Sequence, residues 1–228
     1  MIDMQRSFHR RGFLGTLAAG AAALGITSLV SPLRLNAVPK PVPQGTGLPD
    51  FDAWLSKIKG KHKQVFDAPG HNNGMVFAWS RVFLMTNKQV GAADADVSAI
   101  IVLRHDAIPM AMENKMWEKY KFGESFKFTD GATKAPAVRN PLFHPKEGEL
   151  PIPGMSIEDL LQSGVVMGVC DMALTHYSHD VAEKMKMVAA EVKNDWVAGL
   201  IPGIQLVPSG VLAVNRAQEQ GCTYCYAG

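Results

Sequence analysis

Short apolar runs recur between residue 61 and the end of the chain, and most lack the strict alternation of apolar and polar residues that marks a half-buried strand. Unbroken apolar runs are typical of strands that are covered on both faces. On this basis we expect strands at residues 64–67, 97–104, 165–170, 204–207 and 222–226.

Segments with apolar residues at helical spacing separate these runs. Ser156 stands three positions before Asp159, which is capping-box spacing, and Ser209 is placed to cap the last helix. The expected helices are residues 74–88, 109–120, 156–164, 181–196 and 211–220. The alternation of strands and helices predicts one α/β domain with a mostly parallel five-stranded sheet and helices on both faces.

Residues 121–155 show neither the helical nor the strand-like spacing of apolar residues. They contain five prolines and four phenylalanines. A segment of this length is much longer than an ordinary connection, and such loops in a compact domain usually have a function. The aromatic residues favour a segment that packs onto the domain over a solvated one. We interpret it as an insertion used for packing or for a contact between subunits, with a lid as the alternative.

The N-terminus carries Arg10 and Arg11, followed by Gly12-Phe13-Leu14 and an apolar run to Val30. Paired arginines before such a run predict a twin-arginine export signal, which ends near Ala37. The alternative is a transmembrane anchor. The run is rich in glycine and hydroxyl residues and is only weakly hydrophobic, so we favour a cleaved signal and a periplasmic protein.

The rest of the chain divides into two parts. Residues 38–60 are rich in proline and glycine and predict a tether with a short N-terminal helix. Residues 61–228 are long enough for one compact domain with its own core, and they include the insertion at 121–155.

Charge excludes two classes of partner. The full chain has a formal net charge of +2, and removal of residues 1–37 leaves 19 basic and 20 acidic residues. Without a basic excess or a Lys/Arg run, the chain lacks the electrostatic footprint of a nucleic-acid-binding protein. The same balance gives no support to binding at a membrane surface once the signal is removed.

Several polar residues follow the expected strands directly. In an open α/β sheet, ligands gather beyond the carboxyl ends of the strands, where helix N-termini point free N–H groups into a crevice. The candidates for ligand binding at this edge, besides the residues with reactive side chains, are Asn72, Asp171, Ser209 and Gly210.

Cys170 is the candidate reactive residue because it ends a buried strand and begins a helix. The partial positive charge of a helix N-terminus favours the thiolate, which is the nucleophilic form. An imidazolium at His71 or His105 would favour it further, provided that the thiol is open to solvent at an edge shared with these residues. The alternative is a small core residue, since unpaired cysteine is often buried.

Cys222 and Cys225 form a Cys-x-x-Cys pair near the C-terminus. In a regular strand, residues three apart point to opposite faces, so a direct disulfide would need a turn. No histidine follows Cys225, and one such pair cannot supply a four-thiolate zinc site. A local disulfide, a bond to Cys170 and two free thiols remain open, and we assign no metal or cofactor.

Two strings resemble the DsrE/DsrF-like family of sulfur-relay proteins. They are Val165-Val-Met-Gly-Val-Cys170, and Gly203 to Val214 followed by Gln218 to Gly221. The likeness spans about residues 61–228, and His105 to Tyr120 further resembles an exported branch with twin-arginine signals. The resemblance implies a flavodoxin-like domain, a homo-oligomer such as a trimer or hexamer, and a cysteine that holds sulfur as a persulfide.

Two functional hypotheses follow. The first is a periplasmic protein in which Cys170 accepts sulfane sulfur and exchanges it with a donor or acceptor protein, with His71 or His105 tuning the thiol. The second is a non-catalytic binding module that holds a metal or small ligand at the edge formed by His71, His105 and Cys170.

Overall fold

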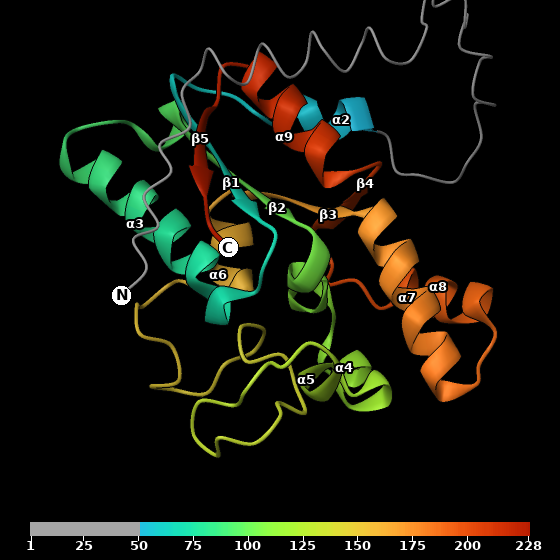
Figure 1. Ribbon diagram of the computed structural model, residues 1–228. Coiled ribbons are helices and arrows are strands. Elements are labelled where there is room, and N and C mark those ends of the chain that lie inside the picture. The colour runs from blue at the N-terminus through green and yellow to red at the C-terminus, as the bar shows by residue number, and fades with distance from the viewer. Residues whose placement is uncertain (1–50) are drawn as a thin grey trace, which may run out of the picture. The chain divides into compact units, whose positions relative to one another are not determined.

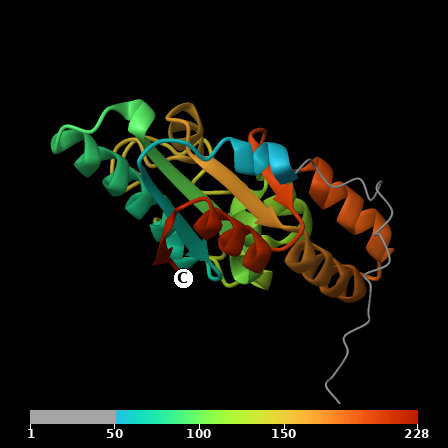
Figure 2. The same ribbon diagram turned by 90° about the horizontal axis from the view of Figure 1, so that it is seen from above.

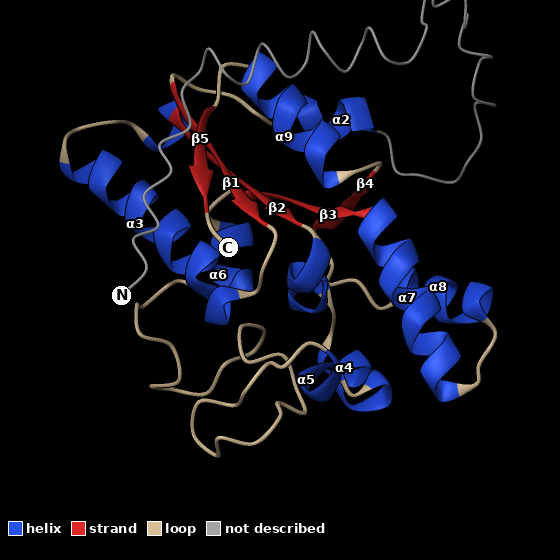
Figure 3. Ribbon diagram, viewed as in Figure 1, coloured by secondary structure: helices blue, strands red, loops and turns tan. Residues whose placement is uncertain are grey.

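A computed structural model describes residues 51–228 (Figure 1). The expected export signal and residues 38–50 of the expected tether lie outside the described residues. The described chain forms one five-stranded sheet with the order β4-β3-β2-β1-β5, in which all neighbouring strands are parallel (Figure 3). The strands are β1 (His62–Ala68), β2 (Val97–Leu103), β3 (Val166–Cys170), β4 (Ile204–Val207) and β5 (Thr223–Tyr226). The expected fold, a single flavodoxin-like α/β domain, is confirmed.

Helices connect all successive strands. The α-helices are α2 (Phe51–Ser56), α3 (Met75–Gln89), α4 (Asn114–Tyr120), α5 (Phe122–Ser125), α6 (Ile157–Gln162), α7 (Asp171–Met185), α8 (Ala189–Ala198) and α9 (Gly210–Glu219). Short 3-10 helices are η1 (Asn72–Gly74), η2 (Asp94–Asp96) and η3 (His105–Ala111). No helix within residues 51–228 is long and apolar enough to cross a membrane.

Side chains on the sheet alternate between two cores. On β2, Ile100 and Val102 join a small core with α2 and α9, whereas Ile101 and Leu103 join a larger core with α3 and the segments from η3 to α8. Figure 1 shows α9 and α2 on one side of the sheet and α3, α6 and α7 on the other. Burial on both faces explains why the sequences of the central strands β2 and β3 lack alternation.

Helix α2 is part of this packed unit. Trp54 is fully buried in the small core, and its Nε1 donates a hydrogen bond to the carbonyl oxygen of Met167 at 3.1 Å. Figure 2 looks onto the sheet from the side of α2 and α9 and shows both helices lying over the strands. The helix expected within residues 38–60 therefore covers the sheet in the same way as α9.

The insertion packs onto the larger core, as expected from its aromatic residues. Phe122, Phe126 and Phe128 are buried in that core. Asn140 is fully buried, and its Nδ2 donates hydrogen bonds to the carbonyl oxygens of Met110 and Met112, both at 3.0 Å. These bonds tie the second half of the insertion to the segment that follows β2.

Two expected helices are wrong in detail. The single helix expected over residues 181–196 is two helices, because Lys186 adopts a left-handed conformation with φ 56° and ends α7. Val188, placed on the expected apolar stripe, is 58% exposed between them. Pro109 lies in η3 rather than in the first turn of an α-helix, and α4 begins later, at Asn114.

The connections after β3 and β4 leave the sheet in opposite directions. Helix α7 follows β3 and packs on the larger core, whereas α9 follows β4 and packs on the small core. When helices after adjacent parallel strands pass to opposite faces, their N-termini separate and leave a crevice at the carboxyl edge of the sheet. The topology therefore places the candidate site between β3 and β4.

Candidate functional site

A cavity of about 480 Å³ opens at this crevice, between the N-termini of α7 and α9. Four of the expected site residues line it: His105, Cys170, Ser209 and Gly210. The other side chains around it include Arg104, Met172, His176 and Val211. The expectation that ligands bind at the carboxyl edge therefore predicted the place of this cavity but only some of the residues that line it.

Cys170 is the last residue of β3 and the N-cap of α7. Its Sγ accepts a hydrogen bond from the backbone N–H of Ala173 at 3.3 Å, so the sulfur lies at the positive end of the helix. Only 6% of the residue is exposed, and it belongs to the larger core. We expected a thiol that is open to solvent, and this is wrong in extent. Cys170 lines the cavity but is nearly buried.

His105 and Ser209 enter the cavity from different elements. His105 is an exposed residue that begins η3 in a left-handed conformation, with φ 48°. Such a conformation costs energy for a residue other than glycine, and it turns the chain sharply after β2. Ser209 caps α9, with its Oγ accepting from the N–H of Leu212 at 3.2 Å.

Arg104 was missed by sequence reasoning. It follows β2, and its guanidinium donates two hydrogen bonds to Asp67 of β1, from Nε to Oδ1 at 2.7 Å and from Nη2 to Oδ2 at 2.9 Å. Tyr224 of β5 donates a third bond to Asp67 Oδ2 at 3.0 Å. Hydrogen bonding to Asp67 raises the pKa of Arg104 above its usual value, despite the opposing effect of burial.

Gly210 is needed where it stands because Arg104 crosses directly over it. A Cβ at position 210 would lie 2.7 Å from Arg104 Cδ and 2.9 Å from Arg104 Cβ. The first turn of α9 and the stem of Arg104 are thus in contact. The absence of a side chain at Gly210 lets the arginine lie against the wall of the cavity.

His71 and Asn72 lie away from this cavity. The His71 ring packs on Phe128 of the insertion, with 4.6 Å between ring centroids, and its Nδ1 accepts from the N–H of Asn73. Asn72 is in η1 and does not line this cavity. His71 follows β1 at the same carboxyl edge of the sheet, but it does not line the cavity that Cys170 and His105 share.

Burial lowers the pKa of His71 below its ordinary value of 6.5, and this effect is partly opposed by the charge of Asp106 and a hydrogen bond to the Phe126 backbone. The unfolded chain therefore binds a proton here more readily than the folded chain, so the free energy of unfolding falls as the pH drops below 6.5. We expect the His71→Gln variant, which cannot titrate at this position, to lose less stability than the wild type between about pH 7.5 and 5. Urea unfolding across this range measures the difference, and parallel losses in both proteins would contradict it.

Asp171 does not line the cavity either. Its carboxylate pairs with Lys193 of α8, with Nζ 3.1 Å from Oδ1. The pair joins the first turn of α7 to α8. A structural role fits these contacts better than the expected ligand-binding role.

The three cysteines are free thiols. Cys222 is buried in the small core, while Cys225 packs against the larger core on the other face of the sheet. The argument from strand geometry is thus confirmed, since residues three apart diverge. Burial raises the pKa of both thiols, which favours their protonated, unreactive form.

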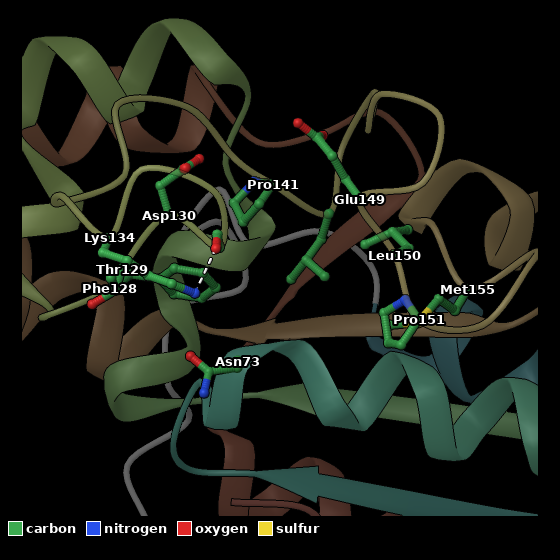
Figure 4. A pocket seen from close by; sticks show the side chains of 12 residues that line it. Asn73, Phe128, Thr129, Asp130, Lys134, Pro141, Glu149, Leu150, Pro151 and Met155 are labelled. Atoms are coloured by element: carbon green, nitrogen blue, oxygen red, sulfur yellow. Dashed lines mark hydrogen bonds between the residues drawn. The ribbon is translucent and has the colours of Figure 1, made fainter.

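A second cavity, of about 290 Å³, lies in the insertion (Figure 4). Its charged side chains are held by local partners. Asp130 Oδ1 accepts from the N–H of Thr133 at 2.8 Å, Lys134 Nζ donates to the Gly131 carbonyl oxygen at 2.6 Å, and Glu149 pairs with Arg139. The three charged side chains that line this cavity are held by partners within the insertion, so it is a weaker candidate than the cavity at Cys170.

The fold and the first cavity define a flavodoxin-like α/β protein with a cysteine site at the carboxyl edge of its sheet. No family model matches the chain, and no curated protein matches it. Within residues 51–228, no group of three or more histidine, cysteine or acidic residues is placed to hold a metal ion.

Proposed function

We propose that the protein is an exported DsrE-like carrier of sulfane sulfur, which it holds as a persulfide on Cys170. One observation carries the proposal: the sulfur lies at the N-terminus of α7 beside a cavity that Arg104, His105 and His176 also line. No carboxylate is among the lining residues of this cavity in the described chain. A helix N-terminus and a neighbouring arginine are typical of the sites in which reactive cysteines occur.

The loading step is a displacement at sulfur. The Cys170 thiolate attacks the outer sulfur of thiosulfate and forms a new S–S bond, while the existing S–S bond breaks and its electron pair leaves with sulfite. With a polysulfide, the leaving group is a shorter polysulfide. No external oxidant or reductant is required, because the sulfane sulfur carries its oxidation state to Cys170.

Unloading reverses these roles. An acceptor thiolate attacks the outer sulfur of the persulfide, and Cys170 leaves as the thiolate. Met172 and Val211 at the rim of the cavity are both 66% exposed, which leaves apolar surface beside the sulfur for a donor or acceptor protein. Assembly as a homo-oligomer and export through the twin-arginine pathway to the periplasm belong to the same proposal.

The proposal predicts a sulfur adduct confined to one residue. Purified protein incubated with thiosulfate or polysulfide should gain the mass of a sulfur atom, which a thiol reductant removes, and peptide mapping should place it on Cys170. The Cys170→Ala variant should gain none, because the remaining thiols are held in the protonated form by burial. Intact-protein mass spectrometry makes the measurement.

The matched control is the Cys222→Ala/Cys225→Ala variant, which keeps Cys170 and should form the adduct as the wild type does. An equal adduct on Cys170→Ala, or none on the wild type, would rule the carrier function out. The second of these results favours the binding-module hypothesis in its small-ligand form. Its metal form has no support from the described residues.

A further inference from the structure

Arg104 occupies the centre of the carboxyl edge of the sheet. It follows β2, pairs with Asp67 of β1, lies against Gly210 of α9 and lines the cavity beside Cys170 of β3. Its side chain is 19% exposed and that of Asp67 is 5% exposed. A nearly buried ion pair that joins several elements holds one fixed geometry.

The pairing uses two of the three guanidinium nitrogens. Nε and Nη2 donate to Asp67, and Nη1 has no hydrogen-bond partner among the described residues. The planar fork of arginine makes this orientation rigid, as a lysine ammonium could not. One N–H group and much of the positive charge therefore remain for another anion near the cavity.

The sulfur of Cys170 is the anion that the geometry offers. Burial at 6% exposure disfavours a charged sulfur, and a cation that lines the same cavity opposes that effect. The pKa of Arg104 is raised chiefly by its hydrogen bonds to Asp67, and negative charge at Cys170 makes a smaller contribution in the same direction. The other titratable residues that line the cavity are His105 and His176, and His176 lies beside Asp180 of the same helix.

We propose that Arg104 is the positioning residue that stabilises the anionic sulfur of Cys170, and that Asp67 sets how strongly it does so by fixing and partly neutralising the guanidinium. Tyr224 supports Asp67 from the edge strand β5. This inference rests on the thiol site of the proposed function and adds the residue that makes a nearly buried thiol reactive.

Removing Arg104 and removing the charge of Asp67 should have opposite effects on the ionisation of the Cys170 sulfur. Removing the cation leaves only the N-terminus of α7 to oppose the effect of burial, so we expect the sulfur to ionise at higher pH. Removing the carboxylate with Asp67→Asn leaves a full positive charge beside the sulfur, which then ionises at lower pH. A residue that only supports the fold would not shift the sulfur in opposite directions.

The test measures the rate at which iodoacetamide alkylates Cys170 across a pH series, with peptide mapping to separate the three cysteines. Arg104→Met alone would leave Asp67 as an unpaired buried charge, so the cation is removed in the Asp67→Leu/Arg104→Met variant, which replaces the pair by apolar side chains. We expect alkylation of this variant near neutral pH to be slower on the order of tenfold, with the midpoint of the profile moved up by about one unit or more.

Two further variants complete the design. Asp67→Asn should move the midpoint down, and Arg216→Met, which removes an exposed arginine near the opposite end of α9, should leave it unchanged. The inference would be overturned if the pH profiles of Asp67→Asn and Asp67→Leu/Arg104→Met coincided with that of the wild type. It would also be overturned if both profiles shifted in the same direction. If the double variant does not fold, Arg104→Lys in its place should raise the midpoint by a smaller amount, and an unchanged Arg104→Lys profile would overturn the inference.

No sulfur donor enters this experiment. Its outcome is therefore independent of whether Cys170 carries sulfane sulfur, and a failed sulfur adduct with the expected alkylation profiles would leave Arg104 in this role.

Discussion

Replacing Trp54 by alanine should lower the free energy of unfolding by about 3–5 kcal/mol. The indole is fully buried between α2 and the sheet, stacks on Phe51 with ring centroids 5.7 Å apart and donates a hydrogen bond to Met167. Truncation removes this apolar contact, leaves a cavity and leaves the Met167 carbonyl oxygen without that partner. Urea unfolding followed by circular dichroism measures the loss.

A second substitution tests whether the loss of stability in Trp54→Ala comes from the contact between Trp54 and β3. A Cβ at Gly168 would lie 3.0 Å from both Trp54 Cζ2 and Val207 Cγ1, so Gly168→Ala should destabilise the wild type. In the Trp54→Ala background the added methyl group enters the vacated space, and its cost should shrink or reverse. Additive effects of the two substitutions would show that Trp54 does not pack on β3 as described.

The sheet could be predicted because its central strands β2 and β3 are buried on both faces, although the edge strand β5 is mostly exposed. Five apolar runs gave five strands, and boundaries differ by no more than two residues at either end, as for β1 at 62–68 against an expected 64–67. Alternation with helices was then enough to predict parallel strands. The strand order and the choice of face for each helix depend on long-range packing, which periodicity does not record.

Helix ends were harder to predict where no capping residue marks them. Ser156 and Ser209 both cap as expected. The break at Lys186 has no such signal, since lysine rarely adopts φ > 0 and the apolar spacing continues across it. Two packed helices and one long helix can show the same pattern of apolar residues.

The site was predicted in part for a related reason. The residues that end a strand or follow it can be found from the sequence. This rule selected Cys170, His105, Ser209 and Gly210. His176 lies a turn or more into α7, where its orientation depends on the helix. Arg104 could have been found, because a charged residue that ends a buried strand needs a partner and Asp67 ends the neighbouring one.

The segment around Ala137 should detach from the first part of the insertion when Gly123 is replaced by alanine. A Cβ at this position in α5 would lie 2.4 Å from the backbone nitrogen of Ala137, with the carbonyl oxygen of Ala137 nearer still. These atoms belong to the backbone and cannot rotate away, so the segment around Ala137 must move. We expect a loss of about 1–3 kcal/mol in the free energy of unfolding, although alanine favours a helix more than glycine does.

Limited proteolysis should also detect this detachment. Phe126 and Phe128 are buried where the insertion meets the larger core, and the N–H of Ala137 donates to the Phe128 carbonyl oxygen at 2.9 Å. Displacing Ala137 breaks this bond and exposes the segment, so cleavage within residues 121–155 should become faster in Gly123→Ala. Gly131→Ala is the matched control, because a Cβ there meets no atom within 4 Å. Equal cleavage of the two variants would show that close contact at Gly123 does not hold the insertion in place.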